Sequence, residues 1–126
     1  MQIYLLLAGL LAILVGLIHS ILGEVLIFNR MRDKQIIPTS AHPALRERHV
    51  RILWATWHAV TVLGWGIAAV LLIYAFPHTG GDSKRLALQA IGISMLAASV
   101  LVFFATRGMH PGWLGLLAVA ALIWLG

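Results

Sequence analysis

The chain has 126 residues, of which 61% are hydrophobic and only 10% are charged, and it carries a formal net charge of +5. Because soluble domains are about a quarter charged, this composition excludes an ordinary globular domain and predicts a single integral membrane domain over residues 1–126. The basic residues lie between hydrophobic segments, so we expect contact with the lipid bilayer and its anionic headgroups and not with nucleic acid. The absence of cysteine excludes disulfides, thiolate metal ligands and cysteine nucleophiles.

The first predicted element is a hydrophobic helix over residues 3–28. It has neither a basic leading segment nor a small-residue cleavage site, so we expect a retained transmembrane helix and not a signal peptide. Its glycines Gly9, Gly16 and Gly23 recur every seven residues. A heptad repeat of small residues predicts a seam along which a second helix approaches closely. If that seam is used inside the fold, it is not available to a partner protein.

The far half of this helix carries three polar residues, His19, Ser20 and Glu24. Such groups are costly in lipid and normally face a neighbouring helix or a water-filled cavity. Ser20 and Glu24 are four residues apart and so lie on one side of the helix, whereas His19 lies on the glycine seam. The Glu24 carboxylate therefore needs a partner, or it has to be protonated.

A long basic loop, residues 29–51, follows the first helix, and three further hydrophobic segments are predicted at 52–76, 86–106 and 111–125. The last segment is short: at about 1.5 Å per residue it barely crosses a hydrocarbon core of about 30 Å. It either thins the bilayer or stops short of the far side. The pattern predicts an all-α fold, an integral membrane bundle of four antiparallel transmembrane helices.

Basic residues are distributed unequally between the two sides of this bundle. The loop 29–51 and the third hairpin share one side and hold seven Lys/Arg residues, whereas the other side holds Lys84 and Arg85. The positive-inside rule then predicts that the loop 29–51 is cytoplasmic and that both termini face outward.

The topology brings polar residues of different helices to the cytoplasmic half of the bundle. Glu24 and His58 each lie about 10 Å from the predicted surface, and His19 lies about a turn deeper. The simplest interpretation is a structural clamp, in which Glu24 accepts hydrogen bonds from His58, Arg51 or Arg107. Such a clamp fixes the register of helices that apolar packing specifies poorly in lipid.

The alternative is a cofactor site. His19 and His58 have the side chains of axial ligands for a b-type haem, and imidazole is a common haem ligand. The propionates would then pair with Arg48, Arg51 or Arg107, whose guanidinium groups match carboxylates. Against this hypothesis, the predicted depths of the two histidines differ by about 6 Å.

A transition-metal site is a variant of the cofactor hypothesis, with His19, Glu24, His58 and His110 as candidate ligands. The chain has no His-Glu-x-x-His sequence and no histidine pair at i,i+4 to support it. An enzyme with a serine nucleophile is also not indicated, because Ser20 and His19 are adjacent and diverge by about 100° on a helix. We therefore predict no catalytic residues and expect no enzymatic activity.

Three stretches, residues 19–24, 54–58 and 106–111, resemble small bacterial inner-membrane proteins with four predicted spans. The likeness covers most of the chain and implies a bacterial inner membrane, with the outward termini on its periplasmic side, without implying an activity. The leading interpretation is a non-enzymatic subunit or scaffold that packs against copies of itself, as a homo-oligomer, or against a larger membrane complex. The alternative is a haem- or metal-binding membrane redox protein that uses His19 and His58.

Overall fold

The computed structural model describes residues 1–40, 45–76 and 82–125, and the regular elements in this part of the chain are helical. The first helix does not end abruptly but continues through one π-helical turn and one 3₁₀ turn. The elements are α1 (Ile3–Leu22), the π turn η1 (Gly23–Ile27), the 3₁₀ turn η2 (Phe28–Met31), α2 (Glu47–Ala75), α3 (Asp82–Thr106) and α4 (Gly112–Leu125).

The predicted all-α class is confirmed, but the helices begin earlier than hydrophobicity alone indicates. α2 begins at Glu47, before the hydrophobic segment 52–76, and α3 begins at Asp82, before the segment 86–106. In both helices the added turn carries an acidic residue, which the positive end of the helix dipole favours. A prediction from apolar content misses such turns because they lie beyond the hydrophobic stretch.

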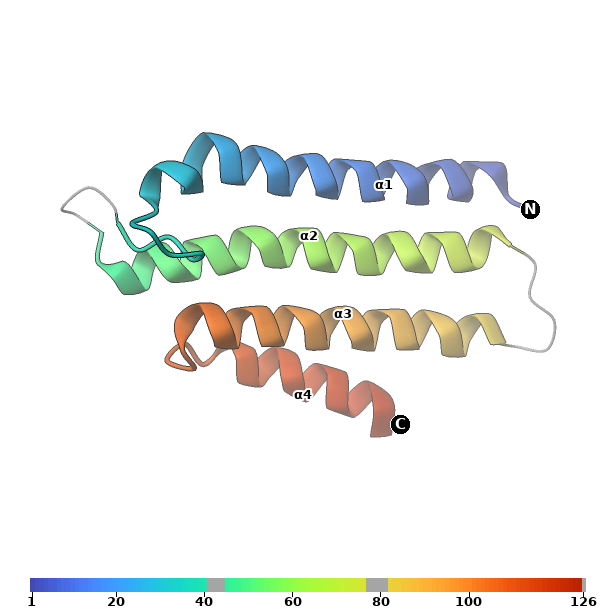
Figure 1. Cartoon of the computed structure of the whole chain (residues 1–126). Helices are drawn as coiled ribbons and strands as arrows, with labels where there is room; N and C mark the ends of the chain where they lie inside the picture. Colours follow the sequence, from blue (N-terminus) through green and yellow to red (C-terminus); the bar gives the residue numbers. More distant parts are fainter. Residues whose placement is uncertain (41–44, 77–81, 126) are drawn as a thin grey trace.

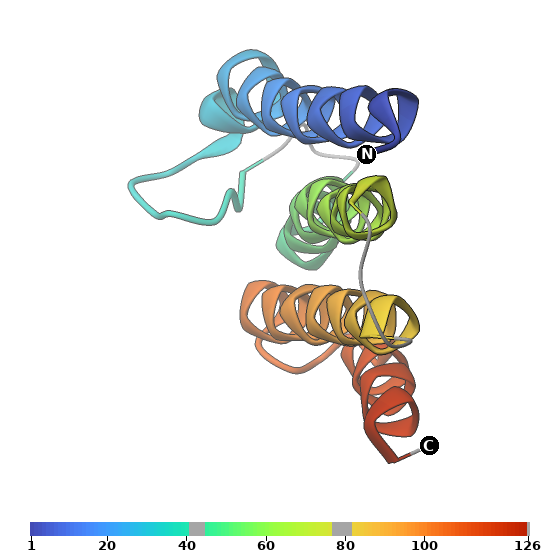
Figure 2. The same ribbon diagram turned by 90° about the vertical axis from the view of Figure 1, so that its right-hand side faces the viewer.

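The four helices pack antiparallel, each mainly against its neighbour in the chain: α1 on α2, α2 on α3 and α3 on α4 (Figure 1). Viewed nearly along the helix axes, they follow one another in a single curved row (Figure 2). The antiparallel packing agrees with the prediction, whereas the closed bundle is replaced by an open layer. Within the described residues, one buried cluster of Ala55, Val102 and Ala105 joins α2 to α3, and Trp113 and Leu116 of α4 pack against it.

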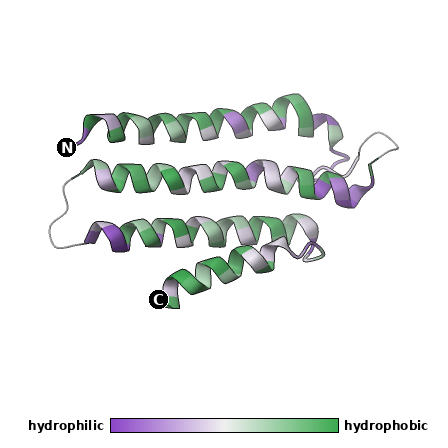
Figure 3. Ribbon diagram, turned by 180° about the vertical axis from the view of Figure 1, so that it is seen from behind, coloured by the Kyte–Doolittle hydropathy of each residue, from purple (hydrophilic) through white to green (hydrophobic). Residues whose placement is uncertain are grey.

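The interfaces of this layer are built from small residues. Most of the buried hydrophobic residues in the described part of the chain are alanines, including Ala55 and Ala68 of α2 and Ala98 and Ala105 of α3. Small side chains allow helix backbones to approach closely, which is the usual mode of packing in lipid. Many large apolar side chains are exposed instead, and apolar residues predominate along the ribbons of all four helices (Figure 3).

Among the described residues, three helices are long and apolar enough to cross a membrane: Ile3–Met31, Glu47–Ala75 and Asp82–Thr106. The fourth is shorter. α4 has 14 residues, a length of about 21 Å against a hydrocarbon core of about 30 Å. Figure 1 shows it ending partway along α3, where Trp124 donates a 3.0 Å hydrogen bond to Gln89. The fourth segment is thus short, as its length in the sequence indicated, and the fold has three long apolar helices and a shorter fourth.

The two ends of the layer differ in character. One end, here called the basic end, comprises η2, the first two turns of α2 and the hairpin between α3 and α4. The hairpin is tight because Gly108 adopts a φ of +74°, which favours glycine, and its N–H donates to the Phe103 carbonyl at 2.8 Å. At the opposite end, the Gln2 N–H donates to the Ala75 carbonyl at 2.7 Å and joins α1 to α2.

Candidate functional site

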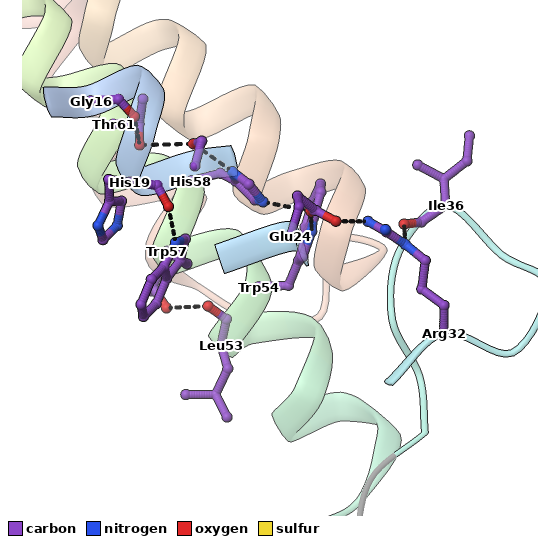
Figure 4. Close-up of polar contacts among 12 residues, drawn as sticks. Gly16, His19, Glu24, Arg32, Ile36, Leu53, Trp54, Trp57, His58 and Thr61 are labelled. Atoms are coloured by element: carbon purple, nitrogen blue, oxygen red, sulfur yellow. Dashed lines mark hydrogen bonds and ion pairs between the residues drawn. The ribbon is translucent and has the colours of Figure 1, made fainter. Parts of the chain in front are cut away.

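A network of hydrogen bonds connects α1 and α2 near the basic end, and Glu24 is its centre (Figure 4). The Glu24 carboxylate accepts hydrogen bonds from the Trp54 indole at 2.5 Å and from His58 Nε2 at 2.8 Å, and it forms an ion pair with Arg32. The expectation that Glu24 and His58 lie at one level is confirmed by this contact. The carboxylate is about a quarter exposed, with a relative accessibility of 27%.

The network continues from His58 toward the middle of the two helices. His58 Nδ1 lies 2.9 Å from the Ser20 hydroxyl, and the Ser20 hydroxyl lies 2.9 Å from that of Thr61. Thr61 also lies 3.3 Å from the Gly16 carbonyl. Because His58 Nε2 donates to the carboxylate, a neutral His58 accepts the Ser20 proton at Nδ1. Both ring nitrogens of His58 are thus used within the chain.

Helical spacing explains how α2 contributes its part of the network. Trp54, His58 and Thr61 follow one another at intervals of four and three residues, which places them on one face of α2. On the other side, the π turn begins at Gly23 and contains Glu24. Single π turns inside a helix are rare and are frequent at functional sites. Here the turn lies where the Trp57 indole presses against the backbone of the helix.

The glycine seam of α1 is the surface that receives α2, as the heptad repeat predicted. A Cβ atom built on each of its three glycines would lie between 2.1 and 2.8 Å from an α2 side chain. Such distances are too short for real carbon atoms, so each glycine is required for the close approach. The pairs are Gly23 with Trp57, Gly16 with Trp65, and Gly9 with Leu72. The seam is therefore used within the chain.

His19 lies outside the network. Its ring stacks on the Trp57 indole with centroids 4.3 Å apart and planes 8° from parallel, and it points away from the bonds between His58 and Glu24 in Figure 4. It borders a groove of about 490 Å³ whose other walls are mainly apolar. Within the described residues, His19 Nε2 is buried without a hydrogen-bond partner. The structure therefore does not bring His19 and His58 together, and a haem would require His58 to release one of its bonds.

The two arginines predicted beside Glu24 lie elsewhere. Arg51 is 5% exposed and donates from Nε to the Ala105 carbonyl at 2.5 Å, which ties α2 to the last turn of α3. Arg107 lies 3.8 Å from Glu47, which also lies 3.4 Å from Arg51. Of the three donors considered for Glu24, the structure shows His58, whereas Arg51 contacts the end of α3 and Arg107 contacts Glu47.

The four residues predicted as metal ligands are not brought together either. His110 lies in the hairpin after α3, where its Nδ1 accepts the Gly112 N–H at 3.1 Å. In the part of the chain that the structure describes, no group of three or more His, Asp or Glu side chains is arranged to hold a metal ion. Glu24 and His58 are in contact, but His19 and His110 do not join them.

Two members of the network were not predicted. Trp54 lies four residues before His58 on the same helical face, so this spacing was a signal for its contact with Glu24. Arg32 had no comparable signal. It lies beyond the end of the first helix, and its orientation depends on the irregular chain that follows, where its Nε donates to the Ile36 carbonyl at 2.6 Å.

No protein-family model, curated protein or solved structure matches this chain. The function has to be argued from the geometry of the network alone. Ser20, His58 and Glu24 are the three kinds of group found in acyl-transfer triads, but that chemistry also needs N–H donors for an oxyanion. Ser20 lies inside α1, where the backbone N–H groups are used by the helix itself. The arrangement is suited to joining two helices.

Proposed function

We propose that the chain is a small multi-pass membrane protein that acts as a non-enzymatic subunit, packing against copies of itself or against a larger membrane complex. The network around Glu24 is its internal clamp, which fixes α1 against α2. The observation that carries this proposal is that both ring nitrogens of His58 are already bonded, to Glu24 at 2.8 Å and to Ser20 at 2.9 Å. A histidine that coordinates a haem or a metal ion needs one ring nitrogen free of other bonds.

The extent of the network supports the same proposal. It runs from Arg32 at the basic end to Thr61 and the Gly16 carbonyl. Farther along the same interface, Gly9 packs against the side chain of Leu72, which is apolar. A proton path would need polar groups through the whole thickness of the layer. A chain of bonds that ends midway suits a clamp.

A partner requires a surface that the fold has not used. The glycine seam is occupied by α2, but another face of α1 carries exposed apolar side chains. There, six apolar residues at alternating intervals of four and three are each roughly half exposed. This spacing is that of a coiled-coil seam, and we assign it to contact with a second copy of the chain. The residues of this outer stripe are Ile3, Leu7, Leu10, Leu14, Leu17 and Ile21.

Cross-linking in native membranes tests the assignment. The chain has no cysteine, so Leu14→Cys and Leu17→Cys introduce single thiols without further changes. We expect both variants to form disulfide-linked dimers on oxidation, and we expect none from Ile93→Cys, which is 59% exposed on α3. Equal cross-linking at all three positions, or at none, would contradict the stripe. Co-purification of a larger complex without self-cross-links would indicate that the partner is a larger membrane complex and not a second copy of the chain.

The proposal also includes an orientation. The basic end faces the cytoplasm, and the end that holds Gln2 and Ala75 faces outward, in a bacterial inner membrane. Single cysteines at Ser40 and Ser83 distinguish the two sides. A membrane-impermeant maleimide is expected to label Ser83→Cys in intact cells and Ser40→Cys only after lysis. The reverse labelling would invert the orientation.

The competing cofactor hypothesis has a direct optical test. Protein purified in mild detergent, from cells supplied with haem and iron, is expected to show no Soret band and no stoichiometric metal. A Soret band in the unaltered protein that disappears in His58→Ala and in His19→Ala would overturn the non-enzymatic proposal. A band that persists in both variants would indicate adventitious haem and leave the clamp in place.

A further inference from the structure

A cavity at the basic end has no part in the network around Glu24. It lies between the start of α2 and the hairpin that joins α3 to α4, and its volume is about 320 Å³, within the usual range for ligand pockets. Its walls combine cationic and apolar side chains. The lining residues are Arg48, His49, Arg51, Ile52, Thr106, Met109 and His110.

The hydrogen-bond donors of this cavity are arranged at two depths. Arg51 is buried, and among the described residues its contacts with Ala105 and Glu47 use two of its five N–H donors. Arg48 and His110 are exposed. His110 Nδ1 accepts the Gly112 N–H, so the ring proton is on Nε2, which is then available to donate.

The local charge is positive. Arg51 and Arg107 share the carboxylate of Glu47, at 3.4 and 3.8 Å, and Arg48 adds a further positive charge in the cavity wall. This region therefore holds three guanidinium groups and one carboxylate. Guanidinium groups bind phosphate through paired N–H donors and do so more strongly than neutral donors. The cavity is suited to an anion with several oxygen atoms.

The apolar walls restrict the kind of anion. Ile52 and Met109 line the same cavity as the arginines, and Ile52 is the first residue of the apolar part of α2. A soluble anion gains nothing from such a wall, whereas a lipid buries its glycerol and its first methylene groups there. We propose that this cavity binds the phosphate group of an anionic phospholipid, with Arg48, Arg51 and His110 as donors. The proposal uses the orientation of the basic end given above but not the role as a subunit.

Native mass spectrometry of the detergent-solubilised protein tests this site with three probes: phosphatidylglycerol, phosphatidylcholine with the same acyl chains, and inorganic phosphate. We expect one saturable phosphatidylglycerol site that is at least about tenfold tighter than the phosphatidylcholine site. Arg48→Gln is expected to weaken it roughly fivefold, and Arg48→Gln combined with His110→Gln roughly tenfold. Arg30→Gln removes an exposed charge at the same end and is expected to change the affinity less than about twofold.

Each contrary outcome is informative. Equal binding of the two lipids would overturn the proposal, and so would unchanged binding by the double variant. Inorganic phosphate that binds as tightly as phosphatidylglycerol would assign the cavity to a soluble anion instead. Thermal unfolding without added lipid shows whether the double variant is folded, and the single variant Arg48→Gln provides the test if it is not. The result does not depend on whether the protein assembles with a partner.

Discussion

Of the three seam glycines, Gly23 leaves the least room for a Cβ atom, and Gly23→Ala is the change with the most informative consequence. A Cβ atom at this position would lie 2.1 Å from Trp57 Nε1, 2.7 Å from Cε2 and 2.8 Å from Cδ1. The Gly23 backbone has φ −57° and ψ −47°, which alanine adopts without strain. The cost therefore comes from the indole, which has to move.

Trp57 is not free to move. Its Nε1 donates to the His19 carbonyl at 3.1 Å, and its ring stacks on that of His19. Overpacking of a helix interface costs about 1–3 kcal/mol, and loss of the hydrogen bond adds about 0.5–1.5 kcal/mol. We therefore expect Gly23→Ala to lower the free energy of unfolding by about 2–4 kcal/mol. For a domain of this size, that is a fall in Tm on the order of 10 °C.

The chain offers a matched control. Gly64 lies inside α2, and a Cβ atom built there meets nothing within 4 Å. Gly64→Ala is therefore expected to be neutral or to stabilise the helix by up to about 1 kcal/mol. Thermal unfolding of both variants in mild detergent, followed by size-exclusion chromatography, gives the comparison. Equal Tm values for the two variants would refute the reasoning, because backbone propensity alone would then explain both changes.

A further variant tests whether steric crowding by the Trp57 indole causes the loss of stability in Gly23→Ala. Trp57→Leu removes the indole that Gly23→Ala meets, so the double variant is expected to lose less stability than the two single variants together. Contacting residues usually show coupling energies of about 0.5–3 kcal/mol in such a cycle. Additive losses would show that the indole does not obstruct the new methyl group.

Three further predictions concern polar groups. Glu24→Gln removes the charge that pairs with Arg32 and is expected to cost about 1–2 kcal/mol, since the group is partly exposed; an unchanged Tm would contradict this. Ser20→Ala is expected to cost about 1 kcal/mol alone and less in the Glu24→Gln background, because the two act through one network; a double-mutant cycle measures the coupling. Arg51→Met keeps an apolar stem but removes the bond to α3 and is expected to cost about 2 kcal/mol. Arg48→Met at an exposed position is expected to change the stability by less than about 0.5 kcal/mol, and equal losses from these two variants would contradict the role of Arg51.

The sequence predicted the fold class and the glycine seam because both depend on regular spacing. A heptad repeat of glycines along a membrane helix predicts a surface for close helix packing. Side chains of α2 do pack at Gly16 and Gly23. Counting residues inward from the loop also predicted that Glu24 and His58 lie at the same depth. These features need only the rise of the helix and the antiparallel order.

The partners of the polar groups were harder to predict because they depend on rotation about the helix axes. The seam position of His19 suggested that it and His58 could ligate one cofactor, but the Trp57 indole fills the space beside Gly23, and His19 stacks on it instead. The same limitation applies to Arg32, whose direction follows from the π and 3₁₀ turns that end the first helix. A periodic pattern does not predict such turns.

The open layer explains why polar bonds occur at every helix interface. In lipid, apolar side chains gain little by exchanging lipid contacts for protein contacts, so small residues alone specify register poorly. Each interface carries a directional hydrogen bond, and this bond specifies the register that packing of small residues alone specifies poorly. These are Glu24 with His58 between α1 and α2, Arg51 with the Ala105 carbonyl between α2 and α3, and the Ser99 hydroxyl with the Trp113 carbonyl at 2.7 Å between α3 and α4. Because each bond joins a different pair of helices, loss of one bond is expected to loosen mainly the interface that carries it.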